Sequence, residues 1–437
     1  MTTSSSETKR LLRLATLLAL ASFSAVACSV DAPSDDASAS TGASTDDITG
    51  VDQAAVKRQS IGNCWLYATT GWLEALNKGA TGEEKNTSES WLTYWHWFES
   101  LANGFGFPGE KNEIQTGGSF RTAAGLINRY GIMMERDFIT SESDAEMSSR
   151  QSSALEAVNA SLRSGALRDI FAKPAAQRDR AAIRAELDKA WRLDEATIAR
   201  IDAVFGKNVD KTIDRAYANS EPGSGVIRGK DFPVRLKDPT TGAFVTRALS
   251  DATAIGSFGN NGGSFAWADQ YYPSGARERR AFLKRVQRAL HDRMPVILSW
   301  HVDFNALTAD SRFSMEELKR KGPGHQGGHM TVMHDYEATN VPGFGTLKAG
   351  EDATPAQMEA ALSDKTEISF FRVKNSWGAI RPDRWSTAPI LGYHDLDMAY
   401  LDGPIKDCPE SAGNPPDPNK CTSMTVPLND VTMPPGY

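Results

Sequence analysis

Cysteine and histidine are both scarce in this sequence, which has four cysteines and seven histidines among 437 residues. No HExxH, paired CxxC or phosphate-loop motif occurs, so we infer no metal and no nucleotide or other cofactor. A surplus of positive charge is also missing: the formal net charge is −7, which argues against nucleic acid as the main partner. Beyond the N-terminal region, no apolar run is long enough to cross a bilayer.

The N-terminus has the three parts of an export signal: basic residues, an apolar run over 14–21, and small residues before Cys28. We therefore expect residues 1–27 to be removed on export. A cysteine at this position also resembles a bacterial lipobox, although Ala25 stands where leucine is usual. The expected product is a lipoprotein of the bacterial cell envelope, with lipidated Cys28 as its only membrane contact; plain secretion is the alternative.

Residues 28–50 are mostly Ser, Thr, Ala and Asp, with no aromatic residue and no Lys or Arg. Such a composition cannot bury an apolar core, so we expect a disordered tether. At the other end, Cys408 and Cys421 lie in a tail rich in Pro, Asn and Asp. In an exported chain they are natural disulfide partners, and two unpaired thiols are the alternative.

The most informative motif is the segment 59–65, Gln-Ser-Ile-Gly-Asn-Cys-Trp. Apolar residues after Cys64 recur at offsets of three and four, which predicts a helix that begins near this cysteine. A thiol at a helix N-terminus feels the positive end of the dipole, so we expect a stabilised thiolate and a nucleophile. Gln59 and the backbone N–H of Cys64 are candidates for an oxyanion hole.

A nucleophile also needs a base and a group that orients the base. Later in the chain come His329, in an alternating segment, and the sequence Asn375-Ser376-Trp377. The order Gln, Cys-Trp, His, Asn-Ser-Trp resembles the papain-like cysteine peptidases. That resemblance implies Gln59 and Cys64 at the oxyanion hole, His329 as general base, Asn375 as its orienter, and Trp377 shielding the His–Asn hydrogen bond from water.

Further segments resemble the bleomycin hydrolase and aminopeptidase C branch of that family, among them 88–95, 117–132 and 391–401. In this comparison Gly117 and Gly118 match a flat strip of backbone beside the cleft, where a substrate can add as a strand. Taken without the resemblance, the two glycines would be read as an ordinary turn. In that branch the C-terminal carboxylate lies in the cleft; here the chain continues through Cys408 and Cys421, which puts exopeptidase activity in doubt.

The resemblance implies an α+β fold of two lobes, a helical lobe followed by a β-rich lobe. We expect the peptidase domain to span 51–401, with a helical insertion near 150–217 and a C-terminal tail at 402–437. Three apolar stripes at helical spacing mark the insertion. A basic stretch at 277–288 has apolar residues at the same spacing, which favours the solvated face of an amphipathic helix over a site for an anionic ligand.

Other histidines compete with His329. On a strand, His329 and His334 point to opposite faces, so only one can face the cleft. His325, in a glycine-rich loop, is the next alternative, and we found no partner motif for His394.

The predicted function is hydrolysis of a peptide or protein substrate through an acyl-enzyme on Cys64. A transglutaminase-like acyl transferase and a non-catalytic surface-binding homologue are the rivals. The sequence indicates no particular oligomeric state.

Overall fold

The structure of the protein is a computed structural model. It describes residues 50–104, 113–211, 223–255, 262–380, 387–413 and 415–437. The predicted signal (1–27), the lipidation site Cys28 and all but the last residue of the tether (28–50) lie outside these residues. Within the described part of the chain, no helix is both long and apolar enough to span a membrane.

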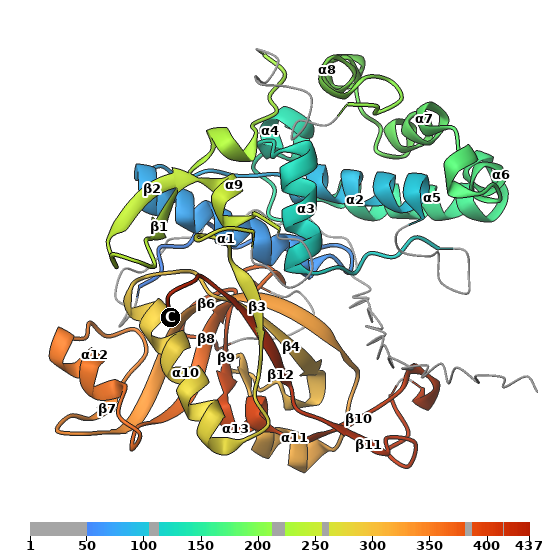
Figure 1. The fold of residues 1–437 in the computed structure, drawn as a ribbon. Helices are drawn as coiled ribbons and strands as arrows, with labels where there is room; N and C mark the ends of the chain where they lie inside the picture. The colour runs from blue at the N-terminus through green and yellow to red at the C-terminus, as the bar shows by residue number, and fades with distance from the viewer. Residues whose placement is uncertain (1–49, 105–112, 212–222, 256–261, 381–386, 414) are drawn as a thin grey trace, which may run out of the picture.

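Helices and strands separate into two lobes, one above the other in Figure 1. The predicted α+β fold with a helical and a β-rich lobe is thereby confirmed. The upper lobe holds α1 (Cys64–Thr81), α2 (Glu89–Asn103), α3 (Phe120–Tyr130), α4 (Glu135–Phe138), α5 (Ser149–Ser164), α6 (Ala166–Phe171), α7 (Arg180–Ala190), α8 (Glu195–Phe205), the hairpin of β1 (Pro233–Lys237) and β2 (Phe244–Ala248), and α9 (Leu249–Ala252).

The ends of the upper-lobe helices follow local chemistry. The side chain of Ser88 accepts a hydrogen bond from the backbone N–H of Trp91 at the start of α2, and Ser119 does the same for α3. Helices α1 and α2 end at Gly82 and Gly104, whose φ values of 72° and 74° lie in the left-handed region that favours glycine. The sequence therefore sets where these helices begin and end.

The helical insertion packs on α2 through aromatic side chains. Trp95 of α2 stacks on Tyr130 of α3, with ring centroids 4.0 Å apart and planes 4° apart. Phe205 of α8 lies edge-on to Trp95, and Trp191, just after α7, contacts Trp97. All five rings are fully buried. The residues that the sequence assigns to apolar stripes thus form the core of this lobe.

The lower lobe is built on one sheet with the strand order β3-β12-β4-β6-β8-β9-β5, and β7 pairs with β6. Its strands are β3 (Ala268–Tyr271), β4 (Ile297–Asp303), β5 (Arg312–Phe313), β6 (Gln326–Val341), β7 (Gly345–Leu347), β8 (Glu367–Lys374), β9 (Tyr393–Asp397) and β12 (Leu428–Met433). Around it lie α10 (Ala276–His291), α11 (Met315–Lys321), α12 (Pro355–Ala361), α13 (Met398–Asp402), and a small hairpin of β10 (Ile405–Asp407) and β11 (Ser423–Thr425). Short 3-10 turns join several of these elements.

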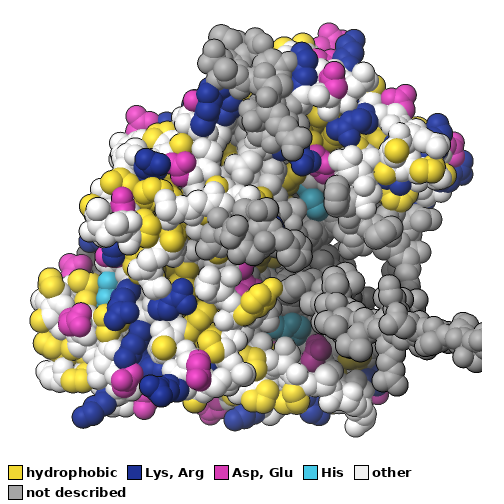
Figure 2. All heavy atoms as spheres, in the orientation of Figure 1, with side chains coloured by type: hydrophobic (Ala, Val, Ile, Leu, Met, Phe, Trp, Pro, Cys, Tyr) yellow, Lys and Arg dark blue, Asp and Glu magenta, His cyan; other side chains and the backbone are white. Residues whose placement is uncertain are grey.

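Helix α10 covers the sheet with its apolar face and presents its basic face outward. Figure 2 shows Lys and Arg side chains gathered over this helix. Several of them bind the protein itself: Arg279 pairs with Asp402 (2.9 Å), and Lys284 pairs with Asp364 (2.5 Å). These contacts agree with the prediction that this basic stretch is the solvated face of an amphipathic helix.

The last 36 residues are not a tail outside the domain. Strand β12 lies inside the sheet, between β3 and β4, and is antiparallel to both. Leu428, Val431 and Met433 of this strand are buried. The structure therefore differs from the predicted domain boundary after residue 401, because pairing between distant strands brings the end of the chain into the core.

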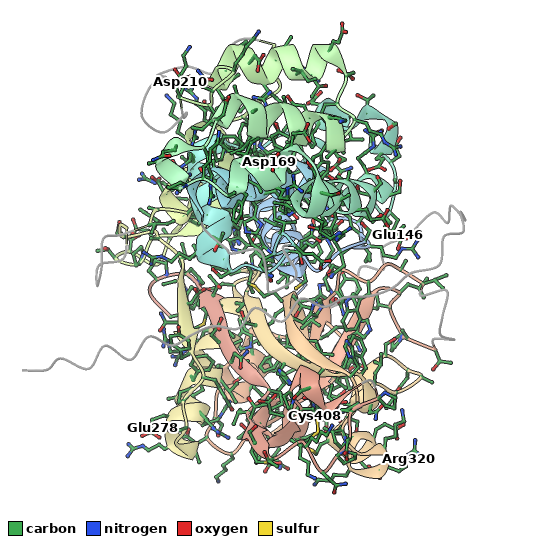
Figure 3. All side chains as sticks on the ribbon, turned by 90° about the vertical axis from the view of Figure 1, so that its right-hand side faces the viewer. Glu146, Asp169, Asp210, Glu278, Arg320 and Cys408 are labelled. Atoms are coloured by element: carbon green, nitrogen blue, oxygen red, sulfur yellow. A yellow bond between two sulfur atoms is a disulfide. The ribbon has the colours of Figure 1, made fainter. Side chains whose placement is uncertain are left out.

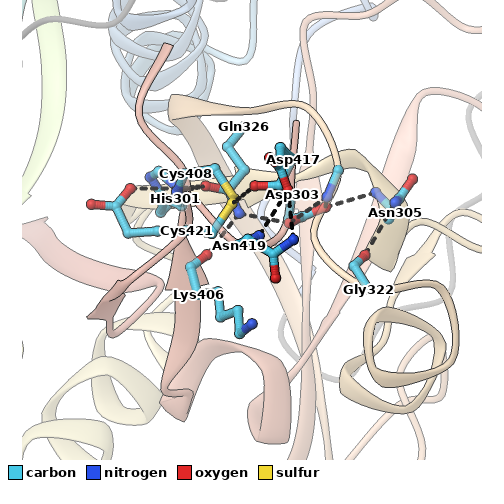
Figure 4. Close-up of a disulfide and its surroundings, with 12 residues drawn as sticks. His301, Asp303, Asn305, Gly322, Gln326, Lys406, Cys408, Asp417, Asn419 and Cys421 are labelled. Atoms are coloured by element: carbon cyan, nitrogen blue, oxygen red, sulfur yellow. Dashed lines mark hydrogen bonds and ion pairs between the residues drawn. A yellow bond between two sulfur atoms is a disulfide. The ribbon is translucent and has the colours of Figure 1, made fainter. Parts of the chain in front are cut away.

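A disulfide joins Cys408 and Cys421, next to the β10–β11 hairpin. Figure 4 shows that polar contacts link this hairpin to the sheet. Gln326 of β6 accepts from the Cys408 N–H at 2.8 Å and donates through Nε2 to Asp303 Oδ2 at 2.7 Å and to the Lys406 carbonyl at 2.8 Å. The cross-link thus closes a loop whose Cys408 end is already tied to the lobe.

Candidate active site

The candidate nucleophile Cys64 is the first residue of α1, at the junction of the two lobes. Asn63 precedes it but does not cap the helix with its side chain. Instead, Asn63 Nδ2 donates to Thr93 Oγ1 (3.0 Å) and to Gln151 Oε1 (2.9 Å). The first N–H groups of α1 therefore have no side-chain cap, and the positive end of the helix dipole lies beside the sulfur.

The predicted substrate strip lies against the residue that follows Cys64. Trp65 donates from Nε1 to the Thr116 carbonyl at 2.8 Å. A Cβ added to Gly118 would come within 2.4 Å of the Trp65 indole, so the backbone can lie this close only if the residue is glycine. Gly117 and Gly118 precede α3 and belong to neither a helix nor a strand. Substrate binding by these two glycines stays a prediction.

His329 lies on β6, directly opposite Trp300 of β4. Only 2% of its surface is exposed. Its Nε2 lies 2.7 Å from Asn375 Oδ1, and since an amide oxygen can only accept, the imidazole proton is on Nε2. The Trp377 indole stacks on the imidazole, with centroids 4.7 Å apart and planes 22° apart. The structure thus brings together three residues that the sequence proposed as base, orienter and shield.

The second ring nitrogen of His329, Nδ1, is buried and has no hydrogen-bond partner among the described residues. With the proton on Nε2, Nδ1 carries a free lone pair. Cys64 begins α1, which packs against β6, and a backbone hydrogen bond from Met330, the residue after His329, acts on its thiol. The thiol and His329 therefore lie on the two elements that face each other at the lobe junction.

Burial acts on the pKa values of both Cys64 and His329. Burial raises the pKa of the Cys64 thiol to about 11, against the opposing effect of backbone hydrogen bonds from Met330, Trp65 and Cys64 itself. Burial also lowers the pKa of His329 to about 4, against the opposing hydrogen bond with Asn375. In both cases the cause is the loss of water around the group, which disfavours its charged form.

Asn375 follows the end of β8 and is held on several sides. Its backbone N–H donates to the Gly392 carbonyl (3.1 Å), and its Oδ1 also accepts from the Ser376 backbone N–H (2.7 Å). Its Nδ2 lies 3.2 Å from Nδ1 of His394, on β9. No motif in the sequence marks His394 as a partner of Asn375. The sequence holds only a weak indication of this contact. A strand after Asn375 carries a second histidine, and pairing of that strand with β8 would bring the histidine close to Asn375.

Gln59 is joined to the residue that follows Asn375. The backbone N–H of Gln59 donates to the Ser376 carbonyl at 2.8 Å, and Ser376 Oγ donates to Gln59 Oε1 at 2.6 Å. Gln59 Nε2 donates to the Ile61 carbonyl at 2.9 Å, which uses one of its two protons. The amide orientation is thus set by its partners, and one N–H is left for another acceptor.

The two alternative histidines have other partners. His334 Nδ1 lies 3.1 Å from the Val51 carbonyl, and its ring packs edge-on against Tyr393. His325 is exposed, and its ring stacks on Phe304. His329 is the histidine bonded to Asn375.

Buried charges lie beside the candidate site, around a small cavity with room for about one water molecule, lined by Lys57, Glu74, Glu89, Thr331 and Lys374 among others. Lys57 Nζ binds Glu89 at 2.7 Å and Glu74 at 3.5 Å. Burial lowers the pKa of Lys374 to about 8. In the described ranges, no group of three or more His, Cys, Asp or Glu side chains is arranged to hold a metal ion.

No protein-family model matches the chain, and no curated protein matches it. Among solved structures, PepW from Lactobacillus rhamnosis is similar with a TM-score of 0.41 and 13% identity, over 88% of this chain and 80% of that one. The clostridial cysteine protease Cwp84 has a TM-score of 0.31 and 10% identity, over 87% and 54%. Procathepsin L 3 of Tenebrio molitor has a TM-score of 0.30 and 14% identity, over 94% and 75%. Similarity this low carries no argument, so the function is inferred from the site.

Proposed function

We propose that this protein is a papain-like cysteine peptidase, with Cys64 as nucleophile, His329 as base and acid, and Asn375 as orienter. The observation that carries the proposal is His329 itself. Its Nε2 is bonded to Asn375 beside the Trp377 ring, while its Nδ1 is buried without a partner among the described residues, on the strand whose next residue, Met330, acts on the Cys64 thiol. A buried ring nitrogen with a free lone pair can accept a proton, and we take the Cys64 thiol as its source.

In the first step, the sulfur attacks the carbonyl carbon of the substrate while His329 Nδ1 takes the thiol proton. A neutral imidazole is the form that can accept this proton, which suits the lowered pKa of His329. The carbonyl π electrons move to oxygen. That oxyanion is stabilised by the backbone N–H of Cys64 and the remaining Gln59 Nε2–H, each donor being worth about 3 kcal/mol.

In the second step, the tetrahedral intermediate collapses. The C–N bond breaks, and the imidazolium of His329 returns its proton to the leaving amine, which leaves an acyl thioester on Cys64. Water then attacks the thioester carbon while His329 takes a proton from it. The carboxylic acid leaves, and the thiol is restored. Asn375 keeps the imidazole in the tautomer that all these transfers need.

The proposed substrates are peptides or proteins, as the resemblance to the papain-like cysteine peptidases implies. Leu428 of strand β12 pairs with Trp300 of β4, and Trp300 in turn pairs with His329. The later residues of β12 pair with β4 residues farther from His329. The last residue, Tyr437, is bound at its carbonyl by Arg285 Nε (2.6 Å) and through its hydroxyl to Asp292 (2.6 Å). Arg285 belongs to α10 and Asp292 follows it, so Tyr437 is held against that helix.

Cys64→Ala is expected to abolish hydrolysis of an N-blocked fluorogenic peptide, because no other thiol is free among the described residues. The melting temperature should stay near that of the wild type, since the change only removes a sulfur. Asn375→Ala should lower kcat less than Cys64→Ala does, because it orients and does not react. Retained turnover in Cys64→Ala would refute the assignment. A matched peptide with a free amine, cut much faster than its N-blocked form, would instead favour an aminopeptidase.

The two rivals give different outcomes with the same protein. A transglutaminase-like enzyme would incorporate a primary amine into an acyl donor without net hydrolysis. A binding homologue would neither turn over substrate nor react with an epoxide thiol probe. We further propose export through residues 1–27 and lipidation of Cys28; mass spectrometry of the mature N-terminus tests both, and an unmodified N-terminus at residue 28 or later would exclude the lipid.

A further inference from the structure

The structure assigns a second histidine to this site: we propose that His394 is a positioning residue, which holds the Asn375 amide in the orientation that His329 requires. The inference rests on the proposed peptidase function. Its observation is the chain of contacts from His329 Nε2 to Asn375 Oδ1, and from Asn375 Nδ2 to His394 Nδ1, at 2.7 and 3.2 Å.

The direction of these hydrogen bonds follows from the donors and acceptors available. The Asn375 oxygen accepts from His329 and from the Ser376 backbone N–H, so the amide nitrogen must face the other way. An amide nitrogen only donates, and His394 Nδ1 therefore accepts. If the amide turned over, a nitrogen would face His329 Nε2–H, and the imidazole would lose the partner that keeps its proton on Nε2.

The surroundings of His394 fit a residue held in one place. It is 6% exposed, and it lies on β9 opposite Val373 of β8, two residues before Asn375. Its ring packs edge-on against Trp377, with centroids 5.2 Å apart, and lies tilted by 46° against Phe313 at 5.9 Å. Trp377 therefore contacts both imidazoles: it stacks on His329 and meets His394 at its edge. One indole thus fixes the two rings that bracket the asparagine.

Two replacements separate the hydrogen bond from the packing. His394→Phe keeps a ring against Trp377 and Phe313 but removes the acceptor. His394→Asn places an amide oxygen near the position of Nδ1 and restores an acceptor for Asn375 Nδ2. His325→Leu is the control, because it removes an exposed histidine that contacts neither Asn375 nor His329 in the described structure.

For an N-blocked peptide we expect His394→Phe to lower kcat about tenfold, the worth of one hydrogen bond of about 1.4 kcal/mol, with KM within about twofold of wild type. His394→Asn should recover most of kcat, and His325→Leu should match the wild type. An unchanged kcat in His394→Phe, or an equal loss in both variants at position 394, would overturn the inference, since the second result points to packing alone.

Nitrogen-15 NMR of the His329 imidazole tests the inference without activity. The wild type should show the tautomer protonated at Nε2, His394→Phe a mixture of tautomers, and His394→Asn the wild-type signal. If the wild type fails to cut peptides but shows this pattern, the proposed function is wrong and the positioning role stands. If His394→Phe does not fold, His394→Leu replaces it, and His394→Asn with a mixed His329 signal would also overturn the inference.

Discussion

Two buried regions of this molecule are held together by opposite means. Around α2, Trp91, Trp95, Tyr130 and Phe205 contact one another almost entirely through apolar rings. At the lobe junction beside Cys64, the contacts are between charges and hydroxyls: Lys57 binds Glu74 and Glu89, and Thr70 Oγ1 donates to Glu89 at 2.6 Å. The side view in Figure 3 shows the helical lobe and the sheet meeting along this junction.

The comparison shows that the contacts which stabilise the upper lobe differ from the contacts which set the positions of individual groups near the site. Apolar burial is non-directional, so the aromatic core stabilises the upper lobe without fixing any one atom closely. Charged hydrogen bonds are directional and costly to leave unmade in a dry interior, so they fix the segment before Cys64 against α1 and α2. The site needs residues from both lobes, Cys64 from α1 and His329 from β6, and it lies where the directional contacts are.

Trp95→Ala should have the largest effect on stability, since it empties the centre of the aromatic core. We expect a loss of about 4 kcal/mol in the free energy of unfolding, measured by urea denaturation. Tyr271→Ala is the control, because this ring is 67% exposed, and it should change that free energy by less than about 0.5 kcal/mol. Equal losses for the two variants would show that the α2 cluster is not the core of stability.

Lys57→Met should destabilise the protein by about 3 kcal/mol, because it leaves the carboxylates of Glu74 and Glu89 buried without their cation. The double variant Lys57→Met/Glu89→Leu removes one of those charges and should be more stable than Lys57→Met alone. A double-mutant cycle in urea measures the coupling. Additive losses would mean that the junction is not held by paired charges.

Cys408→Ser/Cys421→Ser tests a third region, the hairpin outside both buried clusters. Opening a loop of this length should cost about 2 to 3 kcal/mol through the entropy gained by the unfolded chain. Peptidase activity should be retained, because Gln326 still ties the hairpin to the sheet. The measurements are the unfolding midpoint and kcat/KM; lost activity at full stability would place the hairpin in the function.

Glu135 gives the most specific effect, which appears only as a change of stability with pH. Burial, and then the charge of Glu89, raises its pKa to about 8, from 4.5 without these neighbours. The folded protein therefore binds the proton more tightly than the unfolded chain, and this contribution to stability is complete below pH 4.5 and is lost as the pH rises toward 8. Glu135→Gln should reduce this loss of stability with rising pH. The measurement is the free energy of unfolding at pH 5.5 and at pH 8.

A matched change on the surface sharpens this result. Glu83 is exposed, and its pKa is lowered by the hydrogen bond from Lys85, so Glu83→Gln should leave the fall between pH 5.5 and 8 in place. Glu135→Gln with the wild-type slope would contradict the assigned protonation of the buried carboxyl.

Local patterns in the sequence predicted much of this fold. The spacing after Cys64 predicted α1, the stripes at 150–217 predicted α5 to α8, and the alternation around His329 predicted β6. The order of motifs named the residues that the structure brings to one place. These features depend on neighbours within a few positions along the chain, which periodicity and capping residues report.

The features that the sequence did not predict depend on distant contacts. Strand β12 has only a short, irregular apolar pattern, and its burial comes from pairing with β3 and β4. His394 reaches Asn375 only because β9 pairs with β8. The raised pKa of the Cys64 thiol is a result of burial, which no local motif reports.

The central claim is tested most directly by labelling native protein with a peptidyl epoxide that reacts only with an activated thiol, followed by mass spectrometry of the peptides. We expect one adduct, on Cys64, and its loss in His329→Ala while the fold is retained. No adduct in the native protein despite reaction of the urea-unfolded chain, or equal labelling of wild type and His329→Ala, would contradict the pairing of this thiol with His329.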